Sequence, residues 1–126
     1  MIKRFVENLE KTIAASSIVL SSSIQKHFGP NGKTAYVKGQ IIFMNSSILE
    51  IAIFVTEFSN TLSIDKYRFQ YMDNHGKMHF RYDNAPHHHE LPTYPHHKHT
   101  PDKTIQATLP SLKDVLNEIS AIIIGK

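Results

Sequence analysis

The sequence contains no cysteine, and this absence excludes several kinds of chemistry. Disulfide bonds, thiolate zinc sites and thiol nucleophiles are all ruled out, which leaves histidine, aspartate and glutamate as the strong metal ligands. The chain also lacks any run close to the ~20 apolar residues that a membrane-spanning helix needs. Lys3 and Arg4 precede the apolar stretch 13–20, but that stretch is short and charged residues separate it from them. We therefore expect a cytoplasmic protein without a membrane partner.

Length and composition describe a small folded protein. Its 126 residues are enough for one hydrophobic core and too few for two, so we expect one domain over residues 1–126. The formal net charge is +3 with histidines neutral, and it rises as any of the nine histidines takes up a proton. A charge of this size is weak evidence for a nucleic-acid partner, because many small proteins carry it.

Apolar periodicity predicts an amphipathic helix near each end of the chain. The first covers residues 2–13, and the second begins at Pro110-Ser111 and ends at Gly125. Their expected buried residues are Ile2, Phe5, Val6, Leu9 and Ile13 in the first helix and Leu112, Val115, Leu116, Ile119 and Ile122 in the second.

Between the helices, alternating apolar residues and turn signals predict about five antiparallel strands. They cover residues 14–28, 33–44, 48–58, 62–73 and 77–82, and residues 104–108 favour a further short strand. Short connections favour a meander, so the predicted fold is α+β, with both helices packed on a curved antiparallel sheet. The third strand is apolar on both faces, which predicts a central strand covered on both sides. Tyr67, Phe69 and Tyr71 are assigned to packing rather than to base stacking.

The segment Arg81–His99, RYDNAPHHHELPTYPHHKH, holds six of the nine histidines. Its prolines fix φ and exclude a regular helix, so we expect a long, stiff Pro/His-rich loop over residues 84–103, before the last helix. Histidine titrates near neutral pH and is the commonest metal ligand, which indicates proton transfer or metal chemistry here. His27, His75 and His79 are isolated and are assigned to the surface or to turns.

A pair of these histidines suits RNA cleavage without a metal. One neutral imidazole takes the proton of a ribose 2′-hydroxyl, and an imidazolium protonates the leaving 5′-oxygen, so DNA is not a substrate. We predict His88 and His97 as this pair, with His96 and His99 as substitutes. Arg81 and Lys98 would stabilise the transition state, and Asp83 would either orient an imidazole or cap the strand end. Predicted substrate-binding residues are Arg81, Tyr82, His87 and Lys98.

Two alternatives stay open beside this prediction, which needs no cofactor. The first is a hydrolase or nuclease that uses zinc or manganese, with His87, His89, Glu90 and His96 as ligands, although no HExxH spacing is present. The second is a module without enzymatic activity that binds RNA or a protein through its histidine-rich surface.

The same segment, followed by a helix containing SLKDVLNEI, resembles the TumE-like family of prokaryotic type II toxins. The family pattern places an Arg-Tyr/Trp-Asp-Asn-Ala-Pro-His run before a PHHxH group and a Leu-Asp/Glu-Val-Leu helix. It matches Arg81, Asp83, Asn84, Pro86, His87 and His88, then Pro95, His96, His97 and His99, then Leu112, Asp114, Val115 and Leu116. The resemblance implies a toxin with a cognate antitoxin that covers the histidine loop.

This chain departs from the pattern at one position. Many relatives carry an acidic residue within the third strand, where this chain reads Leu49-Glu50-Ile51. Glu50 or Glu57 is the candidate substitute for that carboxylate. The sequence also leaves open whether the chain forms a homodimer.

Overall fold

The computed structural model describes residues 1–125, which form one antiparallel sheet and two helices. The sheet has seven strands in the order of the sequence, so each strand pairs with the next one along the chain. The strands are β1 (Val19–Phe28), β2 (Thr34–Phe43), β3 (Ile48–Phe58), β4 (Thr61–Met72), β5 (Met78–Asp83), β6 (His97–His99) and β7 (Thr104–Gln106). The α+β meander is confirmed, with seven strands rather than about five: β7 is the short strand favoured over residues 104–108, and β6 was not expected.

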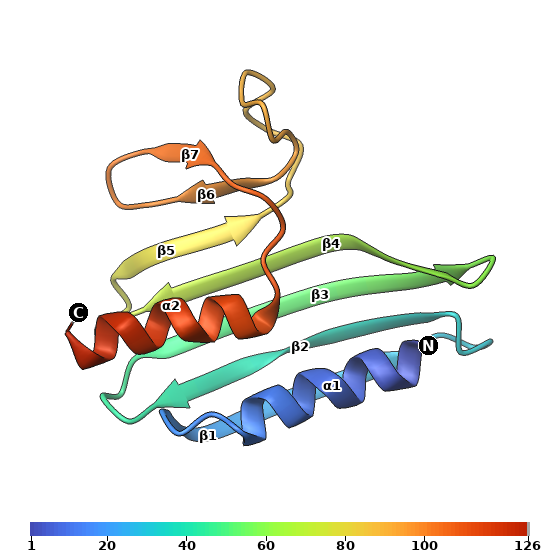
Figure 1. Cartoon of the computed structure of the whole chain (residues 1–126), viewed down its shortest axis with the longest axis horizontal. Coiled ribbons are helices and arrows are strands. Elements are labelled where there is room, and N and C mark those ends of the chain that lie inside the picture. Colours follow the sequence, from blue (N-terminus) through green and yellow to red (C-terminus); the bar gives the residue numbers. More distant parts are fainter. Residues whose placement is uncertain (126) are drawn as a thin grey trace.

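Both helices, α1 (Ile2–Ala14) and α2 (Leu112–Ile124), lie on the same face of the sheet (Figure 1). The hydroxyl of Ser111 accepts a hydrogen bond from the Asp114 amide, and the Asp114 carboxylate accepts one from the Ser111 amide. This capping box starts α2, and Gly125, with φ of 81°, ends it in the left-handed conformation that glycine adopts without strain. The start and end predicted from sequence are therefore confirmed. Neither helix within residues 1–125 is both long and apolar enough to span a membrane.

The core lies between the helices and one face of the sheet. Apolar residues at alternate positions of β3 point toward the helices and are buried: Leu49, Ile51, Ile53 and Val55. The helices contribute Ile2, Val6 and Ile13 from α1 and Leu112, Val115, Leu116 and Ile119 from α2. Ile122 was expected in this stripe but is 39% exposed, because it lies in the last turn, toward the end of the helix.

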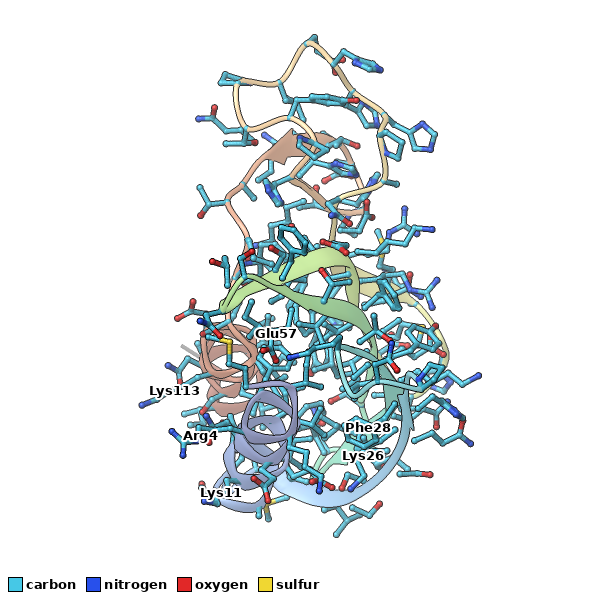
Figure 2. The ribbon with its side chains drawn as sticks, turned by 90° about the vertical axis from the view of Figure 1, so that its right-hand side faces the viewer. Arg4, Lys11, Lys26, Phe28, Glu57 and Lys113 are labelled. Carbon is cyan, nitrogen blue, oxygen red and sulfur yellow. The ribbon has the colours of Figure 1, made fainter. Side chains whose placement is uncertain are left out.

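Within residues 1–125, the opposite face of the sheet carries no helix, and we call it the open face (Figure 2). One row of residues across it, set by the strand register, is Lys38, Ala52, Arg68, Asp83 and His97. The prediction that β3 is covered on both sides was wrong. The neighbours of Ala52 across the strands are charged, and Ala52 and Phe54 are only half-buried. The apolar residues on the second face of β3 are too few to require a second layer.

The predicted Pro/His-rich loop over residues 84–103 contains strand β6. Three residues are too few to show periodicity, which is why the sequence pattern did not predict this strand. Residues 104–106 pair with it as β7. At the other end of the sheet, β1 starts at Val19 rather than at residue 14, because α1 continues through Ala14 and residues 15–18 form the turn that follows it. The connection between β5 and β6 projects beyond the sheet (Figure 1).

Candidate active site

The pairing of β5 with β6 assembles four of the predicted residues. Arg81 lies opposite His99 and Asp83 lies opposite His97 in the antiparallel ladder. Residues directly opposite each other project to the same face of a sheet, and alternate residues of one strand share a face. All four side chains therefore lie on the open face, with Asp83 and His97 at the end of the row defined above and Arg81 and His99 at the end of the next row.

The Asp83 carboxylate is the centre of this group and is almost fully buried. Its Oδ1 lies 2.8 Å from His97 Nε2 and accepts a hydrogen bond of 3.0 Å from the Ala85 amide. Its Oδ2 accepts a 2.9 Å hydrogen bond from Arg81 Nε and lies 3.4 Å from His99 Nε2. Asp83 thus caps the end of β5 and also contacts two imidazoles, so both roles weighed from the sequence occur together.

His97 is enclosed behind the carboxylate, with only 1% of its surface exposed. Its Nδ1 lies 2.8 Å from the carbonyl oxygen of Pro95, which only accepts hydrogen bonds, so Nδ1 carries a proton. Its Nε2 is close to Asp83 Oδ1 but poorly aligned for a hydrogen bond, and it has no hydrogen-bond partner within residues 1–125. Both ring nitrogens face the protein, so His97 is placed to orient its neighbours rather than to touch a substrate.

His99 and His88 are the imidazoles with access to solvent. Their side chains are 20% and 36% exposed, and their ring centres are 5.9 Å apart. His99 Nδ1 is 3.1 Å from the Thr104 hydroxyl, which fixes the ring. Burial and then the nearby Arg81 guanidinium lower the pKa of His99 below its usual value, outweighing the opposite effect of Asp83. His99 is therefore neutral at neutral pH.

The backbone of His88 brings its ring to this group. Its φ of 59° lies in the left-handed region, which is uncommon for residues other than glycine. In this conformation the ring centre lies 5.4 Å from that of His97, and Nδ1 lies 3.3 Å from the Glu90 carboxylate. We call Arg81, Asp83, His88, His97 and His99 the histidine site.

A pocket of about 420 Å³ opens beside the histidine site. His99, Arg81, Asp83 and His87 line one side of it, and Arg68 of β4 and Tyr36 of β2 line the other. The pocket therefore presents the imidazoles of His87 and His99 and the guanidinium groups of Arg68 and Arg81, a combination that suits a phosphate group.

Lys98 and Tyr82 lie on the opposite face of the sheet, under α2. Lys98 Nζ is 2.6 Å from Glu118 Oε2, and the Tyr82 hydroxyl donates a 2.6 Å hydrogen bond to Glu118 Oε1. Burial is the largest single influence and disfavours the Lys98 ammonium, but the hydrogen bonds and charge interactions with Glu118 and Tyr82 together outweigh it, so the pKa of Lys98 is raised. Successive residues of a strand point to opposite faces, so Lys98 points away from His97 and His99, and Tyr82 points away from Arg81 and Asp83. Lys98 and Tyr82 are therefore not part of the histidine site.

The residues predicted as metal ligands do not converge, although His87 lines the 420 Å³ pocket. His96 stacks on Tyr67 and its Nδ1 is 3.0 Å from the Tyr67 hydroxyl, while the His89 ring stacks on Tyr94. Together with His87 and Glu90, these residues do not form a metal-binding group in the described part of the chain. The group whose ligand atoms lie within 4.8 Å of one another is Asp83, His97 and His99.

Two contacts of the site were not predicted from the sequence. The Pro95 carbonyl and the Thr104 hydroxyl each hold one imidazole, and no local pattern marks either of them.

Of the two candidate carboxylates in β3, Glu57 pairs with Lys33 and with the N-terminal ammonium group. Glu50 lies on the open face, in the row that contains Arg81 and His99.

The fold and the site define a small α+β protein whose polar residues gather around a buried carboxylate at the end of an antiparallel meander. Residues 9–123 match the model of the family described as Toxin TumE, and the chain belongs to this family. The resemblance found in the sequence is thereby confirmed. Searches of curated proteins and of solved structures found no match.

Proposed function

We propose that this member of a toxin family cleaves RNA by acid–base chemistry at the histidine site, as the toxin of a type II toxin–antitoxin module. The observation that carries the proposal is the placement of two solvent-accessible imidazoles, His88 and His99, beside an arginine and around a buried Asp83–His97 pair. Proton transfer by positioned imidazoles needs no further group.

His99 acts as the general base in this proposal. Its lowered pKa keeps it neutral near pH 7, and it lines the 420 Å³ pocket where a ribose would lie. It removes the proton of the 2′-hydroxyl, whose oxygen then attacks the adjacent phosphorus. His88 donates a proton to the departing 5′-oxygen. The products are a 2′,3′-cyclic phosphate and a free 5′-hydroxyl.

Arg81 and the buried pair support these two groups. Arg81 uses Nε to bind Asp83, which leaves its other N–H groups for the phosphate as negative charge develops. Asp83 and His97 act as positioning residues, because their polar atoms face the protein. The sequence assigned proton transfer to His97 with His99 as substitute, and the burial of His97 supports the exchange of these two roles.

RNA cleavage by the purified protein tests the proposal, with excess EDTA present and absent. We expect His99→Ala and His88→Asn to lower the cleavage rate by about 10²–10⁴-fold each. Wild-type cleavage should survive EDTA, yield cyclic phosphate ends, and stop when the RNA is 2′-O-methylated. Undiminished cleavage by both variants would show that the chemistry lies elsewhere.

A metal-dependent nuclease is the second candidate, favoured by one specific observation. Asp83, His97 and His99 direct ligand atoms toward one another, and the second nitrogen of each imidazole is held by Pro95 or Thr104, as in many metal sites. Zinc or manganese would fit this donor set. Loss of cleavage in EDTA, with recovery on adding either metal, would favour this candidate over acid–base chemistry.

Membership of a toxin family suggests an antitoxin as the protein partner. We infer that the antitoxin covers the projecting loop between β5 and β6, because blocking the pocket there would stop the proposed reaction. A binding role without catalysis would instead leave RNA intact in every assay.

A further inference from the structure

The open face continues from the histidine site across the sheet in regular rows. In the central row, Lys38 of β2, Ala52 of β3, Arg68 of β4 and Asp83 of β5 follow one another and lead to His97 of β6. Adjacent strands lie about 4.8 Å apart, so the row from β2 to β6 spans about 19 Å. A neighbouring row adds Tyr36, Phe54 and Lys66.

Three exposed cations on this face lack carboxylate partners. Lys38, Lys66 and Arg68 form no ion pair with any group in residues 1–125. Elsewhere Lys26 pairs with Glu10, Lys33 with Glu57 and Lys98 with Glu118. Lys38, Lys66 and Arg68 are thus available to a polyanion beside the histidine site. Within residues 1–125, Arg4 and Lys113 on the helix side are also exposed and form no ion pair, so they provide a comparison of equal charge.

The surface between these cations is hollowed rather than flat. A second pocket of about 360 Å³ adjoins the 420 Å³ pocket, and the two share Tyr36, Ala52 and Arg68. Tyr36 lies at this junction with 38% of its surface exposed. A solvent-facing aromatic ring between cationic side chains is the arrangement on which single-stranded bases stack while the backbone follows the charges.

We propose that single-stranded RNA binds across the open face, with phosphates on Lys38, Arg68 and Arg81 and a base stacked on Tyr36. The strand then enters the 420 Å³ pocket with its scissile phosphate beside His99. Single-stranded RNA is favoured over a duplex because stacking on a side chain requires a base freed from its pair. The inference rests on the proposed function and assigns the substrate class and the binding track.

A 2′-O-methylated, fluorescently labelled RNA separates binding from cleavage, because it lacks the attacking hydroxyl. Its affinity for the full chain is measured over a range of salt concentrations. We expect the double variant Lys38→Gln, Arg68→Gln to bind about tenfold more weakly, and the salt dependence of log K to fall by about 1.4, for two lost contacts to a single strand.

The matched control is Arg4→Gln, Lys113→Gln, which removes the same charge from the helix side (Figure 2). It should bind RNA almost as well as the wild type. If it weakens binding as much as the open-face variant does, the attraction is diffuse and the track is refuted. The thermal midpoint of each variant verifies that the fold is kept, since all four residues are exposed.

Tyr36 provides the second test. Tyr36→Leu should weaken binding about tenfold through the lost stacking, while Tyr36→Phe should retain it. Equal or tighter binding of an RNA duplex would overturn the assignment to single strands. Loss of antitoxin binding without loss of RNA binding in the open-face variants would also overturn it, making this face a protein-docking surface. Binding with the expected variant effects, but without cleavage of unmodified RNA, would retain the track and refute the proposed function alone.

Discussion

Two carboxylates lie on opposite faces of the ladder formed by β5 and β6, and their surroundings differ. Glu118 under α2 binds the Tyr82 hydroxyl and the Lys98 ammonium, and Lys98 also lies over the Phe80 and Tyr82 rings. Asp83 on the open face contacts Arg81, His97 and His99, two of which reach solvent. The first cluster is closed and joins a helix to the sheet. The second leaves N–H and imidazole groups facing a pocket, as a reactive site requires.

Replacing Asp83 should give the largest effect and would separate the two clusters most clearly. Asp83→Asn keeps the shape but removes the buried carboxylate charge that accepts hydrogen bonds from Arg81 Nε and the Ala85 amide, so we expect about 3 kcal/mol less stability. RNA cleavage should also be lost, because His97 and His99 lose the carboxylate that orients them. Urea unfolding and cleavage assays on the same samples measure the two effects. Full stability together with lost cleavage would mean that Asp83 acts only in the reaction.

Glu118→Ala is the counterpart on the closed side. It removes two hydrogen bonds that involve an ionised group, so the free energy of unfolding should fall by about 2 kcal/mol. Cleavage below the unfolding temperature should stay at the wild-type rate, because Glu118 and Lys98 lie on the other face from the histidine site. A loss of cleavage comparable to that of Asp83→Asn would show that the two faces are functionally coupled.

The difference between the faces also shows what the sequence could predict. Long strands and helices alternate over enough residues to show periodicity, so the meander, both helices and the ends of α2 were correctly expected. Strand β6 has only three residues, so its alternation was invisible, and Lys98 was grouped with the histidines beside it. The composition of the segment correctly marked where polar chemistry gathers. The face of each side chain depends on pairing with β5, which is a tertiary contact.

Burial was equally hidden from the sequence. The sequence does not distinguish His96, His97 and His99 from one another. In the structure His96 stacks on Tyr67, His97 is buried and His99 is partly exposed. The Pro95 carbonyl and the Thr104 hydroxyl hold two of these rings. Their positions depend on the path of the backbone in the β5–β6 connection and in the β6–β7 hairpin. Only the three-dimensional arrangement distinguishes a reacting imidazole from a positioning one.

Replacing His88 should have a smaller effect on stability and tests one member of the histidine site. Its left-handed backbone is tolerated better by asparagine than by alanine, because asparagine populates this region more often. His88→Ala should therefore be about 1 kcal/mol less stable than His88→Asn. Both variants should lose cleavage equally, since neither carries an imidazole. Thermal unfolding gives the first comparison and the cleavage assay gives the second, and a variant that keeps cleavage would remove His88 from the proposed pair.

The pH dependence of cleavage gives the smallest effect, but it tests the role of His99 in the histidine site most directly. A base works only when neutral, so cleavage falls as the pH drops through the pKa of His99. We call this fall of the rate at low pH the acid limb. The usual pKa of histidine is 6.5, and burial and Arg81 lower the pKa of His99, so the acid limb should lie below that pH. Arg81→Gln removes a cation that opposes protonation and frees Asp83 to favour it. The acid limb should therefore move upward, in addition to a loss of rate that is the same at every pH.

Arg68→Gln is the matched control for this shift. Arg68 lines the same pocket but is not among the groups that alter the pKa of His99, so its loss should lower the rate and leave the limb in place. Titration of the His99 ring proton by NMR follows the same change without substrate. A limb that moves equally in both variants would mean that phosphate binding, rather than protonation of His99, sets the profile. An acid limb that moves only in Arg81→Gln would identify His99 as the base. It would also show that the histidine site is reactive, in contrast to the closed cluster around Glu118.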